Sequence, residues 1–173
     1  MIEDTVELAG SFPGPCRLLF SEDIPELAMP GGIETGRQSS GDLGARLAAA
    51  FNEGFAAGAK KIVVLGSDSP HLPARFLREA LDALDTDAEL VLGPAEDGGY
   101  YLIAARRFSP EVFAGVEWGS ARVFDQTRGA AERAGFRVAT LEMFYDLDEW
   151  ADVMRLVRES GTSAPRTRNR ITC

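Results

Sequence analysis

Three observations on the sequence predict an α/β fold with a doubly wound, mostly parallel sheet flanked by helices. Short apolar segments alternate with amphipathic stretches along most of the chain, a pattern typical of strands joined by helices. Residues 61–66 form an almost continuous apolar run, as in strands buried on both faces of a parallel sheet. Gly and Pro residues separate the segments, and no internal repeat marks a second domain. We therefore predict one domain over residues 1–158 and a disordered basic tail over residues 159–173.

The individual elements follow from spacing and from helix-start signals. Ile2, Val6 and Ala9 share one face of a helix. Asp42 is a natural N-cap, and Pro73 suits the first turn of a helix. The expected order is helix 2–9, strand 16–20, a Pro-, Gly- and Ser-rich loop over 21–41, helix 42–58, strand 61–66, a helix from Pro73, strands 89–92 and 100–105, helical segments 112–113 and 120–134, strand 138–141 and helix 148–157.

The composition limits the classes of partner. The 173 residues carry a formal net charge of -9, which argues against nucleic-acid binding because that function requires a basic surface. No apolar run is long enough to cross a bilayer, and the acidic first residues do not resemble a signal peptide. We therefore expect a cytoplasmic protein with no membrane partner. Two Cys and one His are too few for a disulfide framework or a His-rich metal site.

Acidic residues follow two of the predicted strands. Asp68 comes just after strand 61–66, and Asp97 follows strand 89–92. Because ligands bind at the carboxyl ends of strands in open α/β sheets, we expect both carboxylates at one edge of the sheet. Gly98 and Gly99 permit unusual backbone conformations or close approach to a ligand. The alternatives are that Asp68 caps the next helix and that Asp97 and Gly98 form a hairpin turn.

A third acidic segment follows the last predicted strand. Asp146 and Asp148 are two residues apart, so one can face the sheet edge while the other caps the next helix. Carboxylates that converge from separate strand ends suit Mg²⁺ or Mn²⁺, with phosphate oxygens completing the coordination shell. Such an ion would offset the repulsion between these carboxylates and a nucleotide. A helix cap alone explains only one of the two residues.

Other residues give weaker signals. The Gly41 turn at a helix N-terminus can hold an anion or a base edge, although a capped helix is the preferred interpretation. His71 has no obvious partner in the sequence and is expected at the surface. Trp118 and Trp150 are expected to be packing residues.

Four motifs together resemble a known family. They are Gly41–Gly44, Gly66–Pro70, Gly93–Tyr101 and Asp146–Asp148, in this order. The chain resembles the radical-SAM/selenodomain-associated transferase 1 family, which is of the DUF2064 type. Its wider relatives are the GT-A nucleotide-diphospho-sugar transferases, which include molybdenum-cofactor and phospholactate nucleotidyltransferases. The resemblance runs through the last helix, and the motif at 93–101 is its most specific part.

The resemblance implies a glycosyltransferase or nucleotidyltransferase activity that depends on Mg²⁺ or Mn²⁺. A nucleotide or nucleotide-sugar would be the donor, and a small molecule the acceptor. Asp68 and Asp148 would be metal ligands, with Asp146 as a further one. Asp97 would be catalytic, because it would orient the acceptor hydroxyl or accept its proton. The implied substrate-binding residues are Gly41, Asp42, Arg46, Gly98, Gly99 and Tyr100.

The chain departs from this family at its start. Members open with a strand and a Lys-Thr-Arg-like loop that lies against the phosphates, and no segment here matches either. We therefore expect the first strand of the sheet to be missing. Because unpaired strand edges leave backbone groups without partners, we expect a homo-oligomer or a shift of the remaining strands toward each other. The alternative function is a catalytically impaired binding or partner subunit that retains the transferase fold.

Overall fold

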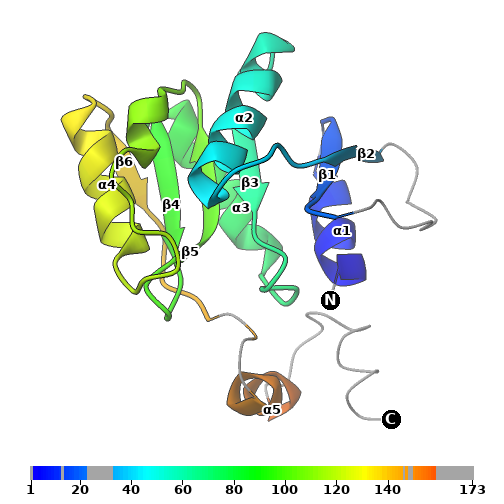
Figure 1. The fold of residues 1–173 in the computed structure, drawn as a ribbon. Coiled ribbons are helices and arrows are strands. Elements are labelled where there is room, and N and C mark those ends of the chain that lie inside the picture. The colour runs from blue at the N-terminus through cyan, green and yellow to red at the C-terminus, as the bar shows by residue number, and fades with distance from the viewer. Residues whose placement is uncertain (1, 13, 23–32, 146, 148–149, 159–173) are drawn as a thin grey trace.

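A computed structural model describes residues 2–12, 14–22, 33–145, 147 and 150–158. Figure 1 shows the helices and strands in their order along the chain. These elements are α1 (Ile2–Gly10), β1 (Cys16–Phe20), β2 (Ile33–Arg37), α2 (Leu43–Ala56), β3 (Ile62–Leu65), α3 (Ala74–Asp85), β4 (Leu90–Pro94), β5 (Tyr100–Ala105), the 3-10 helix η1 (Pro110–Phe113), α4 (Val123–Arg133), β6 (Val138–Thr140) and α5 (Trp150–Arg158).

Four strands form the main sheet, in the order β3-β5-β4-β6. Strand β5 is antiparallel to both β3 and β4, whereas β4 and β6 are parallel. Strands β3, β4 and β6 therefore run in the same direction, and their carboxyl ends meet at one edge of the sheet. The predicted α/β class, with a mostly parallel sheet flanked by helices, is confirmed.

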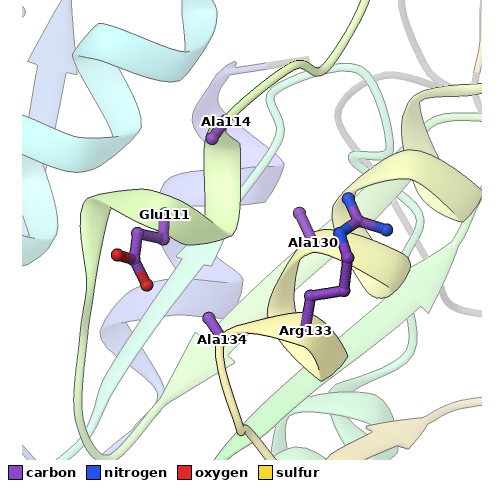
Figure 2. Close-up of a pocket in the computed structure, with 5 residues that line it drawn as sticks. All are labelled: Glu111, Ala114, Ala130, Arg133 and Ala134. Carbon is purple, nitrogen blue, oxygen red and sulfur yellow. The ribbon is translucent and has the colours of Figure 1, made fainter.

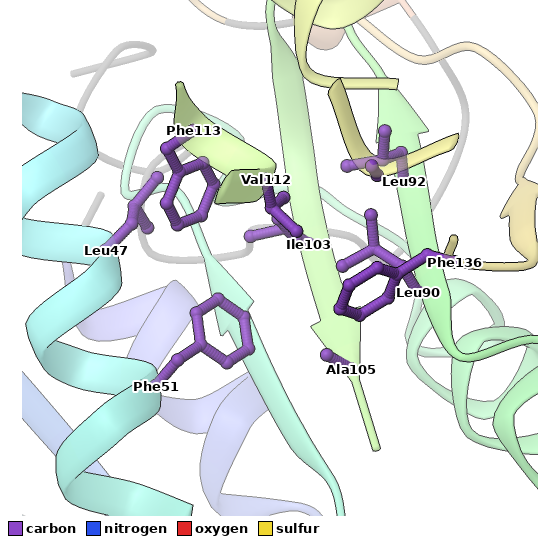
Figure 3. Close-up of a cluster of buried hydrophobic side chains, with 10 residues drawn as sticks. Leu47, Phe51, Leu90, Leu92, Ile103, Ala105, Val112, Phe113 and Phe136 are labelled. Carbon is purple, nitrogen blue, oxygen red and sulfur yellow. The ribbon is translucent and has the colours of Figure 1, made fainter. Parts of the chain in front are cut away.

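Apolar side chains fill both faces of the sheet because its central strands alternate sides with a period of two. On one face, Leu90, Leu92 and Ile103 pack against α2, η1 and α4 (Figure 3). On the other face, Val91 and Leu102 pack against α3. Every residue of β4 is buried. Full burial of one such Leu or Ile side chain contributes about 1.5–3 kcal/mol, so these two clusters dominate the stability of the fold.

The structure corrects the predicted loop over residues 21–41. Ile33–Arg37 is strand β2, which pairs with β1 in parallel register. Its segment contains one apolar residue, Ile33, and shows no apolar alternation, so pairing with β1 rather than burial makes it a strand. Gly36 lies beneath the Arg17 side chain, where a Cβ would lie 2.9 Å from a guanidinium nitrogen. Residues 23–32 of the predicted loop lie outside the described residues.

Strands β1 and β2 form a separate two-stranded sheet. Arg17 of β1 pairs with Glu53 of α2 at 2.8 Å, and Leu8 of α1 packs against the α3 face of the main sheet. Within the described residues no ladder joins β1 to β3, so the expected shift of the remaining strands toward each other is not observed. All four residues of β3 are only half-buried, in contrast to those of β4. Self-association stays a prediction.

The remaining expectations on elements need smaller corrections. Pro73 is the N-cap of α3 and does not lie in its first turn. Trp150, expected to be a packing residue, begins α5 with 71% of its surface exposed, because α5 buries Leu156 instead. The predicted tail lies outside the described residues. None of the helices that the structure describes has the length and apolar character needed to cross a membrane.

Candidate functional site

Three segments meet at the carboxyl edge of β3, β4 and β6, and main-chain hydrogen bonds join them. After β6, the Phe144 amide donates to the Pro94 carbonyl at 3.0 Å, and the Glu96 amide donates to the Phe144 carbonyl at 3.0 Å. Further along, the Leu147 amide donates to the Asp68 carbonyl at 3.0 Å. The chain after β6 therefore bonds to the loops that follow both β3 and β4, as the shared strand direction predicts.

Asp68 occupies the loop after β3. The Gly66 amide donates to the Tyr101 carbonyl at 3.1 Å, which extends the β3–β5 ladder by one residue. Ser69 and Pro70 are buried, whereas Asp68 is exposed. The Ser67 hydroxyl donates to Asp68 Oδ1 at 3.0 Å. The Gly66 hydrogen bond and the buried residues Ser69 and Pro70 thus hold the loop in place, while Asp68 is exposed to solvent. This arrangement suits binding of a cation.

Asp97 lies in the turn between β4 and β5. The Ala95 amide donates to the Gly99 carbonyl at 3.0 Å, and the Gly99 amide donates to Asp97 Oδ1 at 2.7 Å. The hairpin interpretation of this segment is therefore confirmed, and it coexists with a position at the sheet edge. Asp97 is exposed, and Oδ2 is left available for a ligand.

Gly98 has a structural role in this turn. Its φ of 90° lies in the left-handed region, and a Cβ would stand 2.6 Å from the carbonyl carbon of Ala121. The Phe124 amide donates to the Gly98 carbonyl at 2.9 Å, so this turn caps the start of α4. Gly99 would place a Cβ 3.1 Å from Asp97 Oδ1. Contact of either glycine with a substrate stays a prediction.

Gly41, Asp42 and Arg46 form a self-contained start to α2. Asp42 Oδ1 accepts from the Ala45 amide at 2.9 Å, as expected for an N-cap. Arg46 Nε donates to the Gly41 carbonyl at 3.0 Å, and a second guanidinium nitrogen donates to Gln38 Oε1 at 3.1 Å. The capped-helix interpretation is confirmed for Asp42, and the substrate-binding role of these three residues stays a prediction.

Tyr100 presents its ring to the apolar cluster on the α2 face. Its hydroxyl is buried and makes no hydrogen bond within the described residues. Burial raises the pKa of Tyr100 above its ordinary value. The phenol is therefore neutral at physiological pH. Its predicted contact with substrate stays untested.

Asp146 and Asp148 lie outside the described residues, so their part in a metal site stays a prediction. Within the part of the chain that the structure describes, no three His, Cys, Asp or Glu residues are grouped closely enough to hold a metal ion. The described residue between the two aspartates, Leu147, is the one whose amide bonds to Asp68. Asp68 is an exposed oxygen donor, which fits a hard cation such as Mg²⁺ or Mn²⁺.

Four side chains pack in a column beside the site: His71, Tyr145, Arg155 and Glu96. The sequence did not reveal this packing. His71, expected at the surface, is 2% exposed, and its ring lies 4.3 Å from that of Tyr145 between centroids. The Arg155 guanidinium lies 3.7 Å over the Tyr145 ring and pairs with Glu96 at 3.1 Å. The column thus connects the Asp68 loop, the segment after β6, α5 and the Asp97 turn. Only the adjacent aromatic residues Phe144 and Tyr145 hinted at such packing.

A pocket of about 280 Å³ lies between η1 and α4 (Figure 2). Its lining combines two charged residues of opposite sign with three alanines: Glu111, Arg133, Ala114, Ala130 and Ala134. None of these residues belongs to the predicted site. The pocket therefore gives no support to any of the predicted ligands.

The comparison with protein families decides the classification of the chain. Residues 7–120 match the model of a family described as uncharacterized proteins conserved in bacteria, DUF2064. The chain belongs to the DUF2064 family. The matched segment of this DUF2064 protein includes Asp68, the Asp97 turn and the start of α2.

Two named proteins are similar to this DUF2064 chain. A phosphoenolpyruvate guanylyltransferase of Chloroflexus aggregans is 32% identical over 151 residues, which cover 83% of this chain and 72% of the relative. A solved structure from Desulfovibrio desulfuricans G20, assigned by name as a nucleotide-diphospho-sugar transferase, superposes with a TM-score of 0.88 at 29% identity. That match covers 99% of this chain and 78% of the other. Both support a function like that of nucleotidyl- or sugar-nucleotide transferases.

Proposed function

We propose that this DUF2064 protein is a metal-dependent transferase that uses a nucleotide or a nucleotide-sugar as donor and a small molecule as acceptor. The observation that carries the proposal is the hydrogen bond between the Leu147 amide and the Asp68 carbonyl. This bond joins Leu147, which stands between Asp146 and Asp148 in the sequence, to the backbone of the predicted metal ligand Asp68. The names of the two similar proteins support the same class of donor.

Each acidic residue has a separate role in the proposed reaction. Asp68 and Asp148, with Asp146, would hold Mg²⁺ or Mn²⁺. A bound divalent cation offsets the charge that develops on a leaving phosphate. Asp97 would orient the acceptor hydroxyl or accept its proton, with Oδ1 held by the Gly99 amide and Oδ2 directed to the acceptor. The assignment to the radical-SAM-associated subfamily and to the GT-A class belongs to this proposal.

One observation favours the second candidate, an impaired binding or partner subunit. Phosphate binding at an acidic edge needs positive charge, and Arg155, which lies beside the Asp97 turn, already pairs with Glu96 at 3.1 Å. In this second candidate the chain would bind the nucleotide without completing the transfer. Nucleotide binding without transfer of the nucleotidyl or sugar group to any acceptor would identify it.

Thermal unfolding with Mg²⁺ or Mn²⁺ and a panel of nucleotides and nucleotide-sugars tests the first step. A ligand present at one hundred times its Kd adds about 2.7 kcal/mol to the stability. For a domain of this size, that energy raises Tm by roughly 5–10 °C. If no combination of ion and nucleotide raises Tm, the proposal fails.

The substitution Asp68→Asn tests the metal site directly. We expect at least about tenfold weaker Mn²⁺ binding, measured by calorimetry, because an oxygen ligand loses its charge. Without metal, the unfolding free energy should change by less than about 0.5 kcal/mol, since Asp68 is exposed. Asp82→Asn, at an exposed position on α3, is the matched control and should bind Mn²⁺ as the parent does. Equal affinity in Asp68→Asn and the control would place the metal elsewhere.

A further inference from the structure

Trp118 packs directly on the first turn of α2. A Cβ at Gly44 would lie 2.8 Å from both Cζ2 and Nε1 of the indole, so only glycine leaves room for the ring there. Gly44 is buried and follows Gly41 and Asp42, two of the predicted substrate-binding residues. The indole therefore stands beside the start of α2, where a base edge is expected.

The loop that carries Trp118, between η1 and α4, also reaches the turn that carries Asp97. The backbone of Ala121 lies against Gly98, and the Phe124 amide donates to the Gly98 carbonyl at 2.9 Å. Trp118 is thus part of the short segment that spans from α2 to the Asp97 turn. These are the two places to which the predicted substrate-binding residues belong.

The conformation of the loop fixes the position of Trp118. The Ser120 amide donates to the Glu117 carbonyl at 3.2 Å, and Gly119 has a φ of 79°, as the third position of a type II turn requires. The Glu117 amide donates to Gln126 Oε1 at 2.7 Å, which ties the turn to α4. Phe113 holds the ring from one side, with 5.8 Å between ring centroids.

Although it is held in place, the indole is not part of the closed core. Trp118 is only half-buried. Its Nε1–H makes no hydrogen bond to the described residues, and the atom is not completely buried. Tryptophan N–H groups usually find a hydrogen-bond partner when they are buried. A fixed aromatic surface with a free donor is suited to a planar ligand that carries acceptor atoms.

We propose that Trp118 forms one wall of the donor site and stacks against the base of the nucleotide, with Nε1 donating to the ligand. The inference rests on the proposed function and adds the residue that recognises the base. Stacking on an aromatic ring suits this acidic protein because it needs no positive charge and tolerates any base. Selection among the bases would then depend on groups that contact the edge of the base.

Fluorescence of a single-tryptophan variant tests the proposal. Trp150→Phe removes the other tryptophan, which is 71% exposed, and leaves Trp118 as the reporter. Titration with GTP, ATP, UTP and CTP in the presence of Mg²⁺ should quench the emission of Trp118. The quenching should saturate with the Kd obtained from thermal unfolding. Free sugars and inorganic phosphate should leave the emission unchanged, and quenching by sugars alone would overturn the assignment to the base.

Substitutions then separate stacking from general damage. Trp118→Ala should weaken nucleotide binding at least about tenfold, and Trp118→Phe by less, because stacking is largely kept. Gly44→Ala should also weaken binding, because its new methyl group displaces the indole. Gly54→Ala is the matched control: it also adds a methyl group to α2, but at a position that faces Cδ1 of Ile62 on β3, 2.5 Å away, and not Trp118. It should leave nucleotide affinity unchanged.

The failure of this inference is distinguishable from that of the proposed function. If nucleotides raise Tm but neither quench Trp118 nor bind more weakly to Trp118→Ala, the role of Trp118 is refuted and the transferase proposal stands. If Gly44→Ala and Gly54→Ala weaken binding equally, the loss reflects α2 as a whole and the stacking role is likewise refuted. If no nucleotide binds, both proposals fall together.

Discussion

Glu89 is an acidic residue whose ionisation is coupled to the fold. Its side chain is 14% exposed and accepts from Arg107 at 2.9 and 3.2 Å and from the Arg137 amide at 3.2 Å. These hydrogen bonds, those from Arg107 above all, lower the pKa of Glu89 to about 2. Because the folded-state pKa is depressed, the stabilisation is complete above the unfolded pKa of about 4.3. It is lost as the pH falls toward 2.

We therefore expect Glu89→Gln to lower the unfolding free energy by about 2 kcal/mol at pH 7, since hydrogen bonds to a charged group are weakened. Chemical denaturation between pH 2 and 7 should show this difference shrinking below about pH 4.3. Glu132→Gln, which breaks an exposed pair with Arg128 within α4, is the control and should cost less than about 0.5 kcal/mol. A difference that is independent of pH would contradict the assigned pKa.

At the scale of elements, the Asp97 turn and α4 depend on each other. The N-cap residue of α4, Arg122, makes no side-chain cap, so the Gly98 carbonyl takes over part of that role. Gly98→Ala would combine the strain of a positive φ with a clash against the Ala121 backbone. We expect a loss of at least about 2 kcal/mol in unfolding free energy, measured by denaturant titration.

Gly58→Ala is the matched control for this substitution. Gly58 has a φ of 93°, close to that of Gly98, but no atom within 4 Å of a new Cβ. Its variant should therefore show the backbone strain alone, about 1–2 kcal/mol. Equal losses in the two variants would show that the contact with Ala121 contributes nothing.

The elements that could be predicted from the sequence are those that carry a strong local signal. The apolar run of β3 and the Asp42 cap of α2 each contain their own signal, and both are present. Strand β2 could not be predicted, since it depends on pairing with β1 and has one apolar residue. His71 was expected at the surface for the same reason, because the rings of Phe144 and Tyr145 that bury it are remote in sequence.

The same contrast holds for the site. The edge that Asp68 and Asp97 share follows from strand direction, which alternating strands and helices predict. The bracing by Arg155 does not follow, since it requires the position of α5 relative to the Asp97 turn. The role of Gly98 as a close contact of Ala121 was also hidden, because glycine is compatible with a turn and with a ligand alike.

At the scale of the whole molecule, the two sheets are not joined, because one edge of β3 has no strand partner among the described residues. The Gly66 amide bonds to β5, so the alternation of an antiparallel ladder makes Val64 face β5 as well. Val63 and Leu65 then direct their backbone groups to the other edge, which has no strand partner among the described residues. We predict that the amides of Val63 and Leu65 exchange with solvent much faster than that of Val64.

Hydrogen exchange followed by NMR measures this difference, with β5 as the internal reference. Adjacent β5 residues such as Leu102 and Ile103 should both be protected, because β5 has a partner strand on each side. Repeating the measurement on diluted protein tests self-association. Protection of Val63 and Leu65 that grows with concentration would confirm pairing between copies, whereas equal protection of all β3 amides in the monomer would refute an open edge.

The bond from the Leu147 amide to the Asp68 carbonyl involves no side chain. Exchanging either residue for another leaves it in place, with proline at position 147 as the exception, since proline has no N–H to donate. The backbone connection at this edge of the sheet therefore does not depend on which side chains the edge carries. Within such a framework, evolution can replace acids, change the bound ion or alter the substrate without having to rebuild the meeting point of the strands.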